Sequence, residues 1–212
     1  MTQPCALLPS ARIYQRLALL FHQPDATLYD PALLAGLRND LAMVGAERLL
    51  PLVDEMAEGL RHTPDLTELT VAYCKLFYGP QKMLAAPYES IYLGGGVLMG
   101  ESARLVSRRY QEARVQVWEG FKNMPDHVAA ELEFLYYTQM RADFAVRSGR
   151  QRAARLWARR HQEFLAAHLS RWVRRFAERV VETSPAPFYR AAAALLAGWV
   201  IRSANTLSSQ AS

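Results

Sequence analysis

Residues 66–100, LTELTVAYCKLFYGPQKMLAAPYESIYLGGGVLMG, change from a helical pattern to a long irregular segment. Up to Phe77, apolar residues recur three or four positions apart, as on one face of an amphipathic helix. From Phe77 to Gly100 the periodicity is lost, and the segment holds two prolines, five glycines and four aromatic residues. Loops longer than about 12–15 residues are uncommon inside compact domains and are usually functional or disordered. Because this one is too apolar for a solvated linker, we expect a long ordered loop around residues 79–100.

The sequence on both sides of this loop has helical periodicity, and no stretch alternates as a strand between hairpin turns would. Before the loop, helices are predicted from a cap at Ser10 to Phe21, from Pro31 past Gly45 towards Leu60, and from Leu66 to Phe77 with Gly79 as C-cap. After the loop, they are predicted from Glu101 to Trp118, from Pro125 onward, from Gln151 to Val181, and from Phe188 to Ser203. We expect Asp126 in the first turn of the helix that is predicted from Pro125. The sequence therefore predicts an all-α fold. We expect a single-domain helical bundle over residues 1–212, in which subregions 1–80 and 100–212 are joined by the loop.

Composition narrows the class of protein. The chain has 212 residues, 51% of them hydrophobic, which is enough for a substantial core. No run approaches the roughly 18 apolar residues of a membrane span, so we expect no stable membrane insertion. Two cysteines, Cys5 and Cys74, cannot form a disulfide framework, and we expect Cys74 in the core. These features favour a cytoplasmic protein.

The net charge of +5 is concentrated in one region. Eleven arginines lie between Arg141 and Arg179, where acidic residues are few. Such a region could attract nucleic acid or an anionic membrane. A solvated outer face is the simpler interpretation, because apolar residues recur at helical spacing between the arginines. We expect no nucleic-acid partner, and a basic nucleic-acid-binding protein remains an alternative.

Enzyme signatures are mostly absent from the sequence. There is no phosphate-binding GxxxxGK[ST], and the glycines at 94–96 lack the strand and helix of a dinucleotide fingerprint. His127 and Glu131 are four residues apart, so on a helix they share a face and could touch one metal ion. The position of Asp126 is also explained if it is a carboxylate in the first turn of a helix, because such a group stabilises the helix by about 0.3–1 kcal/mol. We expect no catalytic residues and no metal, and a helical metal-dependent hydrolase is retained as an alternative.

The long loop admits two interpretations on its residues alone. Pro80 and Pro87 stiffen its backbone, and Phe77, Tyr88 and Tyr92 provide aromatic surface. The segment could plug one end of the bundle, or it could line a groove for an apolar peptide.

Three stretches resemble a known family. LFYGPQKMLAAPYESIYL at 76–93, followed by MPDHVAAELEFL at 124–135, resembles the TorD/DmsD branch of the TorD/DmsD/NarJ family of redox-enzyme maturation chaperones, and FLAAHLSRWVRRF at 164–176 is similar to a later stretch of it. The resemblance extends from about Leu66 to Phe176. The positions that fit LFxGP, PYxSxY and xPDHxxxELxFL are Leu76, Phe77, Gly79, Pro80, Pro87, Tyr88, Ser90, Tyr92, Pro125, Asp126, His127, Glu131, Leu132, Glu133 and Phe134.

The resemblance implies an all-helical cytoplasmic chaperone that is not an enzyme. Such a protein binds the twin-arginine signal peptide and the apo form of a molybdopterin-containing oxidoreductase subunit, assists cofactor insertion and prevents premature export. It implies no bound cofactor, although weak guanine-nucleotide binding would fit the family. The signal-peptide-binding residues carried over are Leu76, Phe77, Gly79, Pro80, Pro87, Tyr88, Glu89, Ser90, Tyr92, Pro125, Asp126, His127 and Glu131.

The needs of a twin-arginine peptide match these residue types. Its apolar segment needs an aromatic groove, and its guanidinium groups need carboxylates in bidentate geometry. Phe77, Tyr88 and Tyr92 are our candidates for the groove. The candidate carboxylates are Glu89, Asp126 and Glu131.

Overall fold

The computed structural model describes residues 8–63, 65–79, 83–116 and 123–210. The elements in these ranges are α1 (Pro9–Leu20), η1 (Ala26–Tyr29), α2 (Pro31–Met43), η2 (Glu47–Leu49), α3 (Leu50–His62), α4 (Leu66–Phe77), α5 (Glu89–Leu93), α6 (Glu101–Glu112), α7 (Val128–Arg147), α8 (Gln151–Ala167), α9 (Leu169–Thr183) and α10 (Pro187–Gln210). All of them are α-helices or 3₁₀-helices. The all-α prediction is confirmed.

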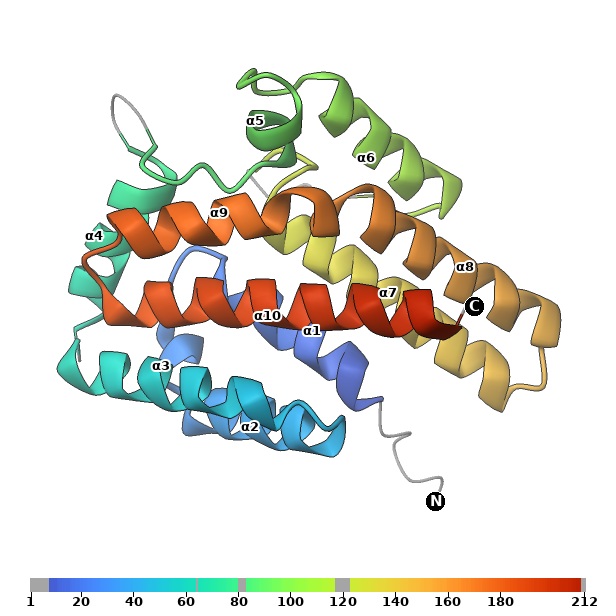
Figure 1. The fold of residues 1–212 in the computed structure, drawn as a ribbon, viewed down its shortest axis with the longest axis horizontal. Helices are drawn as coiled ribbons and strands as arrows, with labels where there is room; N and C mark the ends of the chain where they lie inside the picture. Colours follow the sequence, from blue (N-terminus) through green and yellow to red (C-terminus); the bar gives the residue numbers. More distant parts are fainter. Residues whose placement is uncertain (1–7, 64, 80–82, 117–122, 211–212) are drawn as a thin grey trace.

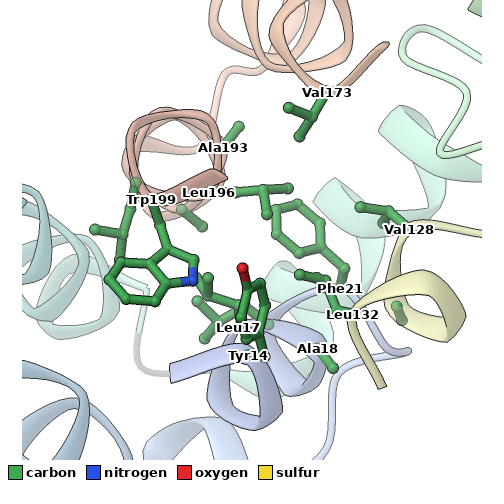
Figure 2. Close-up of a cluster of buried hydrophobic side chains, with 14 of the residues drawn as sticks. Tyr14, Leu17, Ala18, Phe21, Val128, Leu132, Val173, Ala193, Leu196 and Trp199 are labelled. Carbon is green, nitrogen blue, oxygen red and sulfur yellow. The ribbon is translucent and has the colours of Figure 1, made fainter. Parts of the chain in front are cut away.

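The first and last helices share one hydrophobic core. Helix α10 packs against α3, α8 and α9, and α1 packs against α2, α7 and α10 (Figure 1). Figure 2 shows how side chains from distant parts of the chain meet there: Tyr14 from α1, Leu132 from α7, Val173 from α9 and Trp199 from α10. The core therefore joins the part of the chain before the long loop to the part after it.

Two predicted features of the N-terminal half are wrong. Helix α1 begins at Pro9 without a side-chain cap, and the Ser10 hydroxyl accepts a hydrogen bond from the side-chain amide of Gln139. The predicted helix from Pro31 towards Leu60 is divided at Gly45, whose φ is +68°. Glycine adopts this left-handed conformation at little cost, which ends α2.

The predicted helix over 151–181 is also divided. His168, with φ −120° and ψ −96°, separates α8 from α9. Helix α6 ends at Glu112 and is followed by Arg114 at φ +54°, whereas the prediction continued to Trp118, which lies outside the described residues. Cys74, expected in the core, is exposed on α4.

The segment predicted as a long loop contains a short helix. Helix α5 occupies residues 89–93 within it. Gly79 ends α4 as predicted, with φ +35° and its N–H donating to the Cys74 carbonyl at 2.8 Å. Pro80 lies outside the described residues. In Figure 1, α5 and α6 lie together at one edge of the molecule, next to α9 and α8.

Candidate functional site

Two of the three stretches that resemble the family are joined by backbone hydrogen bonds. Tyr88 and His127 form an isolated antiparallel β-bridge. The Glu89 N–H donates to the Asp126 carbonyl at 3.0 Å, and the Val128 N–H donates to the Pro87 carbonyl at 2.8 Å. The PYES and PDH segments are therefore held side by side, although more than 30 residues separate them.

Asp126 stabilises a different helix from the one the sequence suggested. It precedes α7, so the prediction that it lies in the first turn of that helix is wrong. Its Oδ2 instead accepts the N–H of Ser90 at 2.9 Å, in the first turn of α5. Tyr88, at the N-cap position of α5, offers no side-chain cap. A carboxylate from another segment thus satisfies a backbone group that a local cap would otherwise bind.

His127 is the N-cap of α7. Its Nδ1 accepts the N–H of Ala129 at 3.2 Å, so this nitrogen carries no proton. The ring is fully buried and lies edge-on to Tyr88, with the ring centroids 5.2 Å apart. Burial lowers the pKa of His127 to about 3. The imidazole is therefore a neutral cap at physiological pH.

Glu131 is a fully buried carboxyl one turn into α7. Its Oε2 accepts the indole N–H of Trp172 at 3.2 Å. Burial, and then the nearby Glu89 carboxylate, raise the pKa of Glu131 well above the usual range of a glutamic acid. The neutral form of this side chain is therefore favoured in the folded protein.

The third stretch supplies the partner of Glu89. His168 Nδ1 lies 3.1 Å from both carboxyl oxygens of Glu89, and both side chains are buried. The break between α8 and α9 places His168 at this position. Its ring also packs on Phe164, with the ring centroids 4.7 Å apart. The three family-like stretches therefore converge on one buried polar cluster, which we define as Glu89, Ser90, Asp126, His127, Glu131, His168 and Trp172.

Most of the other predicted site residues belong to the core around this cluster. Phe77 is buried against Tyr73, with the ring centroids 5.0 Å apart. Tyr92 stacks on Trp172, with the ring centroids 5.5 Å apart. The remaining predicted residues have backbone or packing roles: Leu76 is buried in the core, Gly79 ends α4, Pro87 accepts a hydrogen bond in the bridge, and the Pro125 carbonyl accepts the Tyr110 hydroxyl at 2.9 Å.

A cleft reaches the buried polar cluster from solvent. It has a volume of about 720 Å³ and lies between α5, α6 and the junction of α8 with α9. The residues that line it are Glu89, Leu93, Gly94, Glu101, Ser102, Leu105, Arg108, Arg109, Glu112, Ala167, His168 and Arg171. Of these residues, the sequence predicts only Glu89 as part of the site, although His168 belongs to the stretch FLAAHLSRW that resembles the family. The cleft therefore presents carboxylates, arginines and apolar side chains together.

The arginine-rich segment forms the exposed faces of α8 and α9. Arg159 pairs with Glu163 at 3.4 Å, and Arg174 pairs with Glu178 at 3.0 Å, one helical turn along. Within the described ranges, no three or more histidine, cysteine or acidic residues gather as a metal site would require. Among the helices described, none is long and apolar enough to cross a bilayer.

The fold and these motifs define a class of protein, the redox-enzyme maturation chaperones. Residues 39–178 match the family described as "Nitrate reductase delta subunit", and the chain belongs to this TorD/DmsD/NarJ family.

Its relatives are chaperones. The chain is similar to the chaperone protein TorD of Vibrio parahaemolyticus, with 31% identity over 166 residues that cover 76% of each chain. It is 28% identical to TorD of Vibrio cholerae O395 over 198 residues, covering 90% of this chain and 88% of the relative. Its fold is similar to that of a redox enzyme maturation protein from Archaeoglobus fulgidus, with a TM-score of 0.56 and 20% identity over 95% of this chain and 97% of the other. The family is not one of enzymes.

Proposed function

We propose that this protein is a cytoplasmic chaperone for one molybdopterin-containing oxidoreductase subunit. It binds the apo-subunit and its twin-arginine signal peptide, assists cofactor insertion and delays export. Family membership supports the general role. The observation that carries the peptide-binding part is that all three family-like stretches converge where the cleft meets the buried polar cluster.

The carboxylates at this place suit an arginine-rich ligand. Glu101 lies on the exposed side of the cleft, and Glu89 lies at its buried end. A guanidinium group makes its strongest hydrogen bonds to a carboxylate. Glu89 is buried and both its oxygens lie near His168 Nδ1, so a guanidinium that reaches Glu89 competes with His168 for it.

Asp126 and Glu131 are further from solvent in this conformation. Both side chains are fully buried, behind α5 and α9 respectively. Direct contact of a peptide with Asp126 requires α5 to move, and contact with Glu131 requires rearrangement around Trp172 of α9. Helix α5 has only five residues, but the Glu89–His168 contact and the stacking of Tyr92 on Trp172 hold it as well, so its displacement has to break these contacts.

Calorimetric titration with a panel of synthetic twin-arginine leaders tests the proposal. Each leader is paired with a control in which both arginines are lysines, because lysine keeps the charge but loses the bidentate geometry. We expect micromolar binding, about −8 kcal/mol, to one or two leaders, weakened by the lysine exchange. Absence of binding to every leader would contradict the peptide-binding part and direct attention to the mature apo-subunit.

A further inference from the structure

The turn between α5 and α6 exposes a group of large apolar side chains. Val97 is 62% exposed, Leu98 39% and Met99 57%, and Leu105 on the adjoining helix α6 is 47% exposed. We call these four residues the apolar tip. Single exposed apolar residues are common on protein surfaces, whereas these four lie between positions 97 and 105 of the chain, and exposed apolar residues that gather on a surface mark interaction sites.

The backbone of the turn holds these side chains away from the core. Gly95 and Gly96 have φ values of +71° and +83°, and each has open space where a side chain would lie. Met99 has φ +59°, which is uncommon for a residue with a Cβ atom. Backbone strain of this kind collects at binding sites, where the surrounding structure maintains it.

One residue of the apolar tip reaches the cleft. Leu105 belongs to the tip and also lines the cleft, together with Leu93 of α5. Glu101, the first residue of α6, lies between Met99 and Leu105 in the chain and contributes its carboxylate to the same cleft. Figure 1 shows the turn at the outer edge of the molecule, beyond α5 and α6. One surface therefore combines apolar side chains with a carboxylate.

At the exposed end of the cleft, Glu101 is the carboxylate that a cationic ligand can contact, and Arg108, Arg109 and Arg171 also line this cleft. Arg108 and Arg109, further along α6, are both paired with Glu112 at 3.2 Å. Among the described residues, no ion pair of Glu101 is found. An incoming guanidinium would therefore meet a carboxylate that is not already occupied, directly beside the apolar tip.

We propose that the apolar tip binds the apolar segment of the leader peptide while the arginines of that peptide lie in the cleft. This inference rests on the proposed function and specifies a different surface from the aromatic residues that the sequence suggested. Phe77 and Tyr88 are buried in the core, whereas the tip is exposed before any ligand arrives. A twin-arginine leader has a cationic and an apolar segment adjacent, so it can contact Glu101 and the apolar tip together.

Matched surface substitutions test this inference. Val97→Thr/Met99→Gln replaces two tip side chains by polar groups of similar shape. Val146→Thr/Met43→Gln is the control, because Val146 is 56% exposed on α7 and Met43 63% exposed on α2. In calorimetric titration with a leader that the wild type binds, we expect the tip variant to lose about tenfold in affinity and the control to remain within about twofold.

A second comparison links the tip to one part of the peptide. A leader in which two leucines of the apolar segment are changed to serine should bind the wild type more weakly. If the tip contacts that segment, the same change should cost less in the tip variant, as a double-mutant cycle measures. Additive losses would overturn the inference.

The outcomes separate this inference from the proposed function. If the wild type binds the leader and the tip variant binds it equally well, the tip is not the docking surface, although the peptide-binding function stands. If the wild type binds no leader, both fail. If the tip variant changes only the oligomeric state in light scattering, the tip is a contact between copies of the chain and the inference is wrong.

Discussion

His168 Nδ1 lies 3.1 Å from each carboxyl oxygen of Glu89, and the two residues are 79 positions apart in the chain. This pair connects the break between α8 and α9 to the first residue of α5. It also lines the buried end of the cleft. The stability of the cluster and its accessibility to a ligand therefore depend on the same contact.

Removing one member of this pair should destabilise the protein strongly. In His168→Leu, the Glu89 carboxylate remains buried without this partner, and leaving a buried polar group unsatisfied costs about 1–3 kcal/mol, and more for a charged one. Urea denaturation at pH 7 measures the free energy of unfolding. The double variant Glu89→Gln/His168→Gln, which has no charge to bury, should recover part of the loss. A change below about 0.5 kcal/mol in His168→Leu would show that the pair is not important for folding.

Asp126→Ala should loosen α5 and leave α7 intact. The Ser90 N–H loses its acceptor, and removal of a helix cap costs about 0.5–2 kcal/mol. Hydrogen exchange should accelerate at the Ser90 amide and stay unchanged at Ala129, which His127 caps. Asp126→Asn keeps an acceptor oxygen and serves as the control. Equal acceleration at both amides would mean that Asp126 supports the whole region and not α5 in particular.

The buried histidine His127 should make the protein sensitive to acid. Its pKa is about 3 in the folded protein, below its unfolded value of about 6.5. The stabilisation from the neutral imidazole is present above about pH 6.5 and is lost as the pH falls towards 3, by at most about 1.4 kcal/mol per pH unit. His127→Asn keeps an N-capping side chain without this titration. Its unfolding free energy should depend less steeply on pH, and identical slopes would contradict the assignment.

The buried Glu131 should make the free energy of unfolding depend on pH in the opposite direction. Its pKa is raised in the folded protein, so its favourable contribution is present below the unfolded value of about 4.3 and is lost as the pH rises through the folded value. Glu131→Gln keeps an oxygen for the Trp172 N–H and cannot ionise. We expect this variant to be more stable than the wild type at pH 8, with a smaller difference at pH 5. A difference that does not change with pH would argue against the raised pKa.

Arg171 should oppose the binding of a basic leader. It lines the cleft on α9, where its charge repels an incoming guanidinium. Arg171→Gln should therefore raise leader affinity by about threefold at low salt, and less at high salt. Arg175→Gln removes an exposed arginine of α9 that does not line the cleft and is the control. The same gain in both variants would indicate a general effect of net charge.

Local patterns were enough to predict most helical segments, but not the breaks at Gly45 and His168 or the short helix α5. Apolar residues at helical spacing mark α4, α9 and α10 in the sequence, and Gly79 marks the end of α4, because these signals arise from residues within one or two turns. The motifs also indicated the family. The same reasoning placed Asp126 in the first turn of the next helix, because only neighbouring residues were visible to it.

The sequence by itself determined that this chain is helical, has one family's motifs and contains a segment that helical periodicity cannot explain. Only the tertiary structure decided what those residues do. Asp126 caps α5, His168 interrupts a helix to bind Glu89, and Phe77 and Tyr88 are buried while Val97 and Met99 are exposed. The physical reason is that each of these outcomes depends on a partner more than 30 residues away, or on whether the rest of the chain covers the side chain. Helical periodicity is a local property, whereas burial and cross-chain hydrogen bonding are not.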